Sequence, residues 1–318
     1  MTAESMTRRP LGGTGLAVTP ICIGTSPLAS MPGLYGYGVD HARAEATVAA
    51  VLDGPLNFID TSNNYGGGNA EERIGAVLRA RGGLPAGVVL ATKADADRDT
   101  GDFSAARVRR SVRESLDRLG LDRVPLMYLH DPEYHLTFEE AMADGGPVSA
   151  LIALRDEGVV DHLGIASGPV DLMRRFVGTG VFEVALNHNR YTLLDRSAEP
   201  LIAEAAAAGI GYVNAAPYGG GILAKGPDAQ PRYAYRDTPE SVREAVRGMQ
   251  RVCAEAGVPL RAPALQFSLR DPRVASTVVG VSDPTRVAAT IEMAELPIPG
   301  PVWAELAALA AKADVHLD

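Results

Sequence analysis

Short apolar runs alternate with longer stretches of helical periodicity along nearly the whole of this 318-residue chain. Eight runs have the length and composition of strands: 21–25, 56–60, 88–92, 124–129, 162–166, 182–187, 211–215 and 275–279. Each precedes a segment with helical spacing: about 41–53, 69–81, 104–119, 147–157, 169–178, 197–208, 239–256 and 283–293. This alternation predicts βα units and a parallel sheet, and eight units predict a closed (β/α)8 TIM barrel.

The segments outside these units complete the expected architecture. Turn glycines between β-prone pieces at 9–18 predict an N-terminal β-hairpin that closes the barrel bottom. Residues 262–270 and 302–312 predict two further helices. Two long connections, 26–39 and 216–238, are expected at the C-terminal face as lids over the barrel mouth, because long structureless connections are uncommon unless they are functional. With no linker or repeat, we expect one barrel domain over 1–318.

Charge and cysteine content argue against several classes of function. A formal charge of -9 and a pI near 5.2 make nucleic acid an improbable partner. Cys22 and Cys253 are too few for a disulfide framework or a cysteine-based zinc site, so reduced thiols in a cytoplasm are expected. Residues 1–10 lack an apolar signal-peptide core, and no apolar run approaches the roughly 18 residues of a spanning helix. We therefore expect a cytoplasmic protein without membrane contact.

Four reactive side chains lie at or just after the ends of successive predicted strands: Asp60, Tyr65, Lys93 and His130. The C-terminal strand ends of a parallel barrel meet at one mouth, so these side chains are expected to converge. A tyrosine with a pKa near 10 must be shifted to work at neutral pH, and the ammonium of Lys93 would favour its phenolate. Asp60 would keep that lysine charged, and His130 would orient a substrate oxygen. The pattern predicts a tyrosine acid/base site.

Each of the four has an ordinary structural explanation when it is taken alone. Asp60 could cap a helix, Tyr65 could anchor the turn at 63–68, and His130 could be a hydrogen-bonded core histidine. Lys93 is harder to explain in this way, since the chain has only three lysines among its 30 basic residues. The joint occurrence at successive strand ends favours catalysis. No local histidine motif for a metal is present, so no metal is expected.

At these residues the chain resembles the aldo-keto reductase family. Segments 57–66, 90–93 and 128–132 resemble the family's catalytic segments, and the resemblance extends from 11–16 to 278–286. Within the family, residues 189–195, 214–218 and 253–267 are most similar to aldose dehydrogenases that oxidise D-threo-aldoses, L-fucose or L-galactose. The resemblance implies hydride transfer between NAD(P) and a sugar hemiacetal, giving a lactone. Relatives on the same scaffold handle pyridoxal or generic aldehydes, so NADPH-dependent reduction of aldehydes or ketones is the alternative.

The resemblance also implies a nicotinamide cofactor, NADP or NAD, extended across the barrel mouth without a GxGxxG loop. The residues that it assigns to the cofactor are Gly24, Thr25, Asp60, Ser167, His188, Ala216, Tyr218, Gly219, Gly221, Leu223, Gly280, Ser282 and Arg286. Ser167 would hold the carboxamide, although the family's usual neighbouring Asn is Gly168 here. Ala215 stands at the position where many relatives stack an aromatic ring on the nicotinamide. The glycines at 219–221 would let the pyrophosphate approach the backbone, or they form a plain flexible loop.

The adenosine end decides the choice of cofactor. A 2′-phosphate needs cationic donors, and Gly280 and Val281 supply none. Ser282 and Arg286 are the candidate donors, although Arg286 could equally be a solvated helix residue, so use of both NAD and NADP is expected.

A small sugar or carbonyl substrate is expected against Tyr65, His130, Tyr35 and Tyr235, and no oligomeric state is predicted. The second class of function is a cofactor-binding regulatory module with little turnover, as in potassium-channel β subunits. The intact catalytic set disfavours it.

Overall fold

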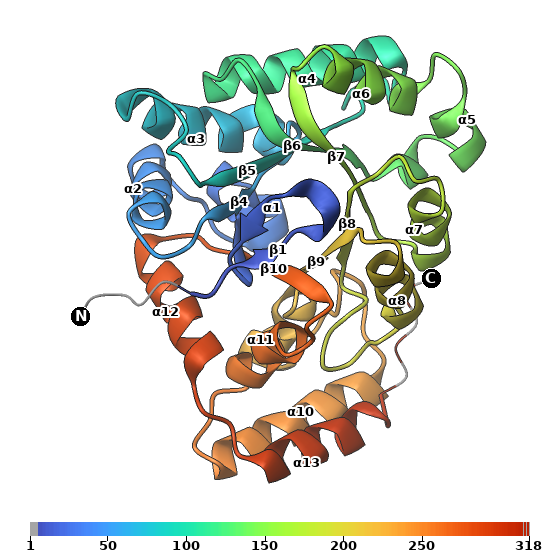
Figure 1. The fold of residues 1–318 in the computed structure, drawn as a ribbon. Helices are drawn as coiled ribbons and strands as arrows, with labels where there is room; N and C mark the ends of the chain where they lie inside the picture. The colour runs from blue at the N-terminus through green and yellow to red at the C-terminus, as the bar shows by residue number, and fades with distance from the viewer. Residues whose placement is uncertain (1–5, 314, 316, 318) are drawn as a thin grey trace.

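The computed structural model describes residues 6–313, 315 and 317. Within them, eight parallel strands close a barrel in the order β10-β3-β4-β5-β6-β7-β8-β9 (Figure 1). The strands are β3 (Ile21–Gly24), β4 (Phe58–Asp60), β5 (Val89–Ala94), β6 (Val124–His130), β7 (Val160–Ser167), β8 (Val184–His188), β9 (Gly211–Ala215) and β10 (Val274–Gly280). Each overlaps one predicted run, and the (β/α)8 prediction is confirmed.

All ten predicted helices are found in the described chain, with bounds within a few residues of those expected. They are α2 (His41–Leu52), α3 (Asn69–Ala80), α4 (Ala105–Leu119), α6 (Pro147–Asp156), α7 (Val170–Val177), α8 (Glu199–Ala207), α10 (Glu240–Glu255), α11 (Arg261–Leu269), α12 (Pro284–Glu295) and α13 (Gly300–Ala310). Most surround the barrel, while α10 and α13 lie side by side outside it (Figure 1). Three short helices were not predicted, because four or five residues carry too little periodicity: α1 (Pro32–Tyr35), α5 (Phe138–Met142) and α9 (Ile222–Lys225).

The N-terminal hairpin closes the bottom of the barrel, as expected. Strands β1 (Arg9–Pro10) and β2 (Ala17–Val18) pair antiparallel around a short 3₁₀ turn, Gly12–Thr14. Gly12 has a φ of +59°, and a Cβ there would overlap the backbone amide of Gly211 at the start of β9. Only glycine allows this close approach. Leu11 and Val18 are fully buried and pack with the side chains that fill the barrel interior.

Side chains on each strand alternate between the barrel interior and the helical layer. On β6, Leu126 and Tyr128 belong to the interior cluster, whereas Met127 and Leu129 pack with the helices. Gly164 on the neighbouring β7 leaves room for the Tyr128 ring, which a Cβ would overlap. This period of two fixes which side chains point inward at the C-terminal strand ends.

The two long connections at the C-terminal face are more ordered than the sequence predicted. The one after β3 contains a 3₁₀ turn, Ser26–Ala29, and α1, while the one after β9 contains another, Gly219–Gly221, and α9. Both contribute to the wall of the cavity described below. In the described part of the chain, no helix is long and apolar enough to cross a membrane.

Candidate active site

Side chains along each strand point alternately into and out of the barrel, and this alternation places three reactive side chains in the interior at the barrel mouth. Asp60 follows interior Phe58 by two residues on β4, Lys93 follows interior Ala91 on β5, and His130 lies two residues beyond Tyr128 on β6. Tyr65 comes from a 3₁₀ turn, Tyr65–Gly68, in the loop that joins β4 to α3. All four of these reactive residues line one cavity, so the structure brings the predicted set together.

Lys93 is the centre of the cluster. Its side chain is 1% exposed, and its Nζ donates hydrogen bonds to Asp60 Oδ1 at 2.6 Å, to the Thr61 carbonyl at 2.6 Å and to Tyr65 Oη at 3.1 Å. These three acceptors use the three hydrogens of the ammonium. The carboxylate balances the buried charge, so the lysine holds the phenol oxygen at a fixed place in the cavity.

The protonation of Tyr65 differs from the sequence-based expectation. Burial raises the pKa of Tyr65 well above 10, and the carboxylates of Asp60, Asp131 and Asp95 raise it further. The net shift of the Tyr65 pKa is therefore opposite to the shift expected from Lys93 alone, because desolvation and three negative charges outweigh one ammonium. The neutral phenol is the form present at neutral pH, and this form is a proton donor.

His130 has partners that the sequence did not indicate. Its Nδ1 lies 2.6 Å from Asp95 Oδ1, and Asp95 also accepts hydrogen bonds from the Ser62 hydroxyl at 2.5 Å and the Asn64 amide at 3.0 Å. The other nitrogen, Nε2, is 3.6 Å from Asp131 Oδ2. Burial works against an imidazolium, but the carboxylates of Asp131 and Asp95 outweigh it and raise the pKa of His130. The only sequence signal for Asp95 is its position two residues after Lys93.

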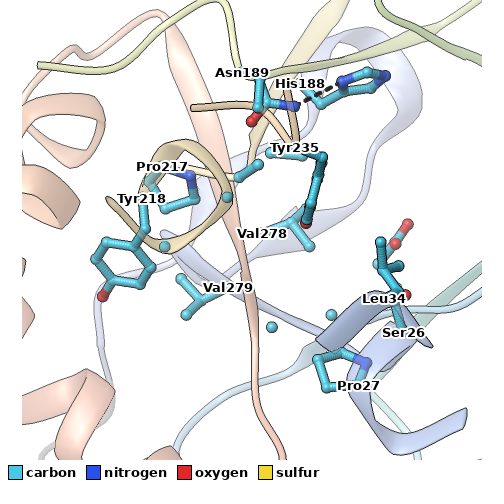
Figure 2. A pocket seen from close by; sticks show the side chains of 18 of the residues that line it. Ser26, Pro27, Leu34, His188, Asn189, Pro217, Tyr218, Tyr235, Val278 and Val279 are labelled. Atoms are coloured by element: carbon cyan, nitrogen blue, oxygen red, sulfur yellow. Dashed lines mark hydrogen bonds between the residues drawn. The ribbon is translucent and has the colours of Figure 1, made fainter. Parts of the chain in front are cut away.

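The cavity has a volume of about 1510 Å³ and extends across the mouth from the Tyr65 cluster to α12. In Figure 2, Pro27 and Leu34 come from the connection after β3, Tyr218 and Tyr235 from the connection after β9, and Val278 from β10. The four predicted substrate contacts all line it: Tyr35, Tyr65, His130 and Tyr235. The connections that carry Tyr35 and Tyr235 therefore share one cavity with the reactive groups.

The predicted cofactor residues divide into two groups. Eight line the cavity: Gly24, Asp60, His188, Ala216, Tyr218, Gly221, Gly280 and Arg286. Five are buried and do not line it: Thr25, Ser167, Gly219, Leu223 and Ser282. Local contacts explain two of these: the Thr25 hydroxyl donates to the Asp60 carbonyl at 2.9 Å, and Gly219 packs so closely that a Cβ on it would overlap the Tyr233 ring.

Ser167, the residue assigned to the carboxamide, is hydrogen-bonded within the protein. The Ser167 hydroxyl donates to Glu133 Oε2 at 2.9 Å, and the Gly168 amide donates to Glu133 Oε1 at 3.0 Å. The hydroxyl donor of Ser167 is thus taken by a carboxylate that itself lines the cavity. Glu133 follows His130 by three residues, and no sequence pattern singled it out.

At the far end, the cavity is lined by side chains of α12 and α11. Arg286 Nε lies 3.2 Å from Asp283 Oδ2, so the candidate phosphate donor is already paired with a carboxylate. Arg261, which was not predicted, also lines this end. Asp283 is the N-cap of α12 and accepts a hydrogen bond from the Arg286 amide at 3.2 Å. The sequence signal for Asp283 is its place before Pro284 at the start of a helix.

These features fit an extended nicotinamide dinucleotide. Gly220 and Gly221, with φ of +74° and +107°, line the wall and allow close backbone approach of a pyrophosphate. Among the described residues, Asp60 Oδ2 is buried without a hydrogen-bond partner, so it is available to a ribose hydroxyl. Arg261 and Arg286 place two guanidinium groups at the far end of the same cavity, the second of them paired with Asp283. In the same part of the chain, no group of three or more His, Cys, Asp or Glu is arranged to hold a metal ion.

Comparisons with known proteins agree with this geometry. The aldo/keto reductase family matches residues 20–311. D-threo-aldose 1-dehydrogenase of a Pseudomonas species is 34% identical, covering 89% of this chain and 97% of its own. L-galactose dehydrogenase of Arabidopsis thaliana is 32% identical, covering 88% and 85%. The holo form of an aldo-keto reductase from Bacillus halodurans superposes with a TM-score of 0.77 at 25% identity, covering 98% of both chains.

The barrel and its site define an NAD(P)-dependent oxidoreductase. The chain belongs to the aldo/keto reductase family, and its relatives support the aldose dehydrogenase branch.

Proposed function

We propose that this protein, acting through its single barrel domain, oxidises a sugar hemiacetal at C1 with NAD or NADP. The proposal is carried by the number of hydrogen-bonding side chains that line the same cavity as Tyr65: Tyr35, Asp131, Glu133, Tyr134, His188, Arg190 and Tyr235. An aldose presents several hydroxyl groups, and each needs a partner when water is excluded. Similarity to D-threo-aldose 1-dehydrogenase and L-galactose dehydrogenase supports the same class of substrate.

The proposed reaction converts the cyclic hemiacetal to a lactone. A hydride leaves C1 with both electrons of the C–H bond, and the hydroxyl on C1 loses a proton. The nicotinamide, when bound, supplies the hydride acceptor. The C1 oxygen becomes a carbonyl oxygen while the ring oxygen stays attached, so the product is an ester within the ring.

Tyr65 is proposed as the acid and base. In reduction the neutral phenol gives its proton to the substrate oxygen, and in oxidation the phenolate accepts it. Lys93 Nζ lies 3.1 Å from the phenol oxygen, and His130, whose ring centroid is 6.1 Å from that of Tyr65, hydrogen-bonds the same substrate oxygen. Because the pKa of Tyr65 is raised, the phenolate is scarce at neutral pH, and we expect oxidation to accelerate as the pH becomes alkaline.

We further propose that NAD is accepted at least as well as NADP. A 2′-phosphate carries about two negative charges and requires donors that are free to bind it. The guanidinium of Arg286 is shared with Asp283, and that carboxylate would repel the phosphate. The same carboxylate suits the 2′-hydroxyl of NAD, since a hydroxyl donates a hydrogen bond to it.

The test is a steady-state comparison of substrates and cofactors. Several aldoses, including L-fucose and L-galactose, are assayed with NAD and NADP, beside pyridoxal, simple aldehydes and aryl ketones in the reductive direction. We expect oxidation of at least one aldose, with a lactone identified as the product. The control is Tyr65→Phe, which should lose about 10²- to 10⁴-fold in turnover while nucleotide binding, followed by protein fluorescence, is retained.

Two outcomes would favour the other candidates. Reduction of aldehydes or ketones with NADPH alone, without oxidation of any sugar, identifies a carbonyl reductase. Tight nucleotide binding without turnover of any substrate in the panel identifies a regulatory module. A Tyr65→Phe variant that keeps more than about a tenth of the wild-type turnover would remove Tyr65 from the acid/base role.

A further inference from the structure

We propose that Asp95 is a positioning residue that anchors His130 through Nδ1 and keeps its Nε2–H directed as a donor toward the substrate oxygen. This inference deepens the proposed function and rests on it, because it concerns how His130 contacts the substrate. Asp95 itself does not line the cavity, so it acts only through the imidazole.

The carboxylate of Asp95 is buried, and both of its oxygens are held by hydrogen-bonding partners. The residue is 4% exposed and lies just beyond β5, two residues after Lys93. One carboxylate oxygen lies 2.6 Å from His130 Nδ1, and the other accepts from the Ser62 hydroxyl at 2.5 Å and the Asn64 amide at 3.0 Å. Two neutral donors and one imidazole therefore fix both oxygens.

The polarity of the hydrogen bond on Nε2 follows from this arrangement. A carboxylate accepts, so Nδ1 must carry a hydrogen whether the ring is neutral or charged. With Nδ1 occupied, Nε2 carries a hydrogen only in the imidazolium. A neutral ring would present Nε2 as an acceptor, which cannot hydrogen-bond a carbonyl oxygen. The charge on His130 therefore decides whether it assists the carbonyl form of the substrate.

Other charged or titratable groups also face His130. Lys93 lies on the neighbouring strand β5 and Asp60 on β4 beyond it, the Tyr65 ring lies edge-on at a centroid distance of 6.1 Å, and Asp131 follows in sequence. Asp131 in turn lies 3.8 Å from His188 Nε2. Lys93 opposes an imidazolium, whereas the three carboxylates favour it. Asp95 is the one in direct hydrogen-bond contact, since the Asp131 oxygen is 3.6 Å from Nε2.

The decisive variant is Asp95→Asn, which keeps the size and an acceptor oxygen but removes the charge. Nitrogen-15 NMR of the imidazole in the full-length protein, without substrate, reports the titration midpoint of His130 and which nitrogen carries the hydrogen. We expect the midpoint to fall by about one pH unit or more, as for the loss of an adjacent opposite charge. A midpoint that does not move overturns the proposal.

Matched variants separate Asp95 from its neighbours. Asp97 lies two residues away, and among the described residues its carboxylate accepts hydrogen bonds from Asp99 and Thr100 of its own exposed loop, so Asp97→Asn should leave the midpoint of His130 unchanged. Ser62→Ala removes a competing donor from Asp95 without removing charge, so the midpoint should not fall. If Asp131→Asn lowers the midpoint more than Asp95→Asn does, Asp131 controls the charge of His130 and the proposal is wrong.

The pH dependence of steady-state kinetics is a second test of the role of Asp95, and it can use any substrate that the protein reduces. In Asp95→Asn, the alkaline limb of the kcat/KM profile for reduction should move to lower pH. Above the new midpoint, kcat/KM should fall about tenfold for every pH unit that the limb has moved. A uniform loss at every pH, without movement of the limb, indicates only a structural role and overturns the proposal. The NMR titration needs no turnover, so failure of the aldose assignment and failure of this inference are distinguishable.

Discussion

Three carboxylates near the reactive groups, two of them buried and one partly exposed, act in different ways. Asp60 is the counter-ion of Lys93, at 2.6 Å, and Asp95 contacts the imidazole of His130. Asp131 lies between two imidazoles and has a left-handed backbone, with φ of 45°. Burial alone would raise the pKa of Asp131, but His130 and His188 outweigh it and lower the pKa to about 2. Each of the three carboxylates therefore lies beside at least one basic side chain, which offsets the cost of removing its charge from water.

A residue-scale prediction concerns cofactor choice. Asp283→Asn keeps an N-cap side chain for α12, because Asn caps a helix about as well as Asp, but it removes the negative charge beside Arg286. The freed guanidinium should bind the 2′-phosphate, so affinity for NADP relative to NAD should increase about tenfold, equivalent to roughly 1.4 kcal/mol. Fluorescence titration with both nucleotides measures the ratio.

Gly280→Lys is the companion variant, since it adds a cation at the end of β10 in the same part of the cavity. It should shift the ratio in the same direction. If neither variant changes the ratio of affinities, this end of the cavity does not bind the adenosine ribose.

At the scale of elements, α3 and α4 brace the turn that carries Tyr65. Arg118, near the end of α4, donates to the Asn63 carbonyl at 3.1 Å and to Glu71 Oε2 at 3.2 Å. Its guanidinium lies where a Cβ on Gly68 would be, at the end of the turn. The close crossing of the two helices therefore holds the loop between β4 and α3 against the barrel.

The crossing depends on Gly75 in α3, where a Cβ would overlap the carbonyl oxygen of Arg118. Gly75→Ala gains about 1 kcal/mol of helix propensity, but overpacking against backbone costs about 1–3 kcal/mol, so we expect a net loss of stability in urea unfolding. The matched control is Gly248→Ala in α10, where the nearest atom is a flexible Leu309 methyl at 2.8 Å. Equal effects of the two substitutions would mean that the α3–α4 contact is not tight.

How much the sequence could predict depends on the range of the interaction. Periodicity within one strand was enough to place Asp60, Lys93 and His130 at the mouth, because alternation is a local property. The contact of Asp95 with His130 joins residues 35 positions apart, and no local pattern indicates it. The family resemblance assigned Arg286 to the cofactor, but its pairing with Asp283 depends on side-chain conformation, which a sequence pattern does not encode.

At the scale of the molecule, one cluster joins the bottom of the barrel to its outer layer. Asp271, just before β10, accepts the Tyr191 hydroxyl at 2.7 Å and the guanidinium of Arg273 at 2.6 Å. Arg9 of the hairpin donates to the carbonyls of Leu269 and Val274 at 2.7 Å. The cluster therefore fixes the hairpin, the segment after β8 and the last barrel strand to one another.

This cluster makes the stability of the protein depend on pH. Burial alone would raise the pKa of Asp271, but hydrogen bonds from Arg273 and Tyr191 outweigh it and lower the pKa to about 2. Because the folded pKa is below the unfolded value near 3.9, the ionised group stabilises the fold fully above about pH 4. That stabilisation is lost as the pH falls through about 2.

We therefore expect Asp271→Asn to lower stability at pH 7 by about 1–2 kcal/mol, a value reduced for the solvent exposure of Arg273. The difference in Tm between the variant and the wild type, followed by circular dichroism, should shrink between about pH 4 and pH 2, because the wild-type carboxyl then becomes protonated and loses its advantage. The control is Asp53→Asn, whose ion pair with Arg81 is exposed and whose Tm should stay close to wild type at every pH. A Tm difference for Asp271→Asn that is the same at pH 7 and at pH 2 would show that Asp271 contributes through packing and not through its charge.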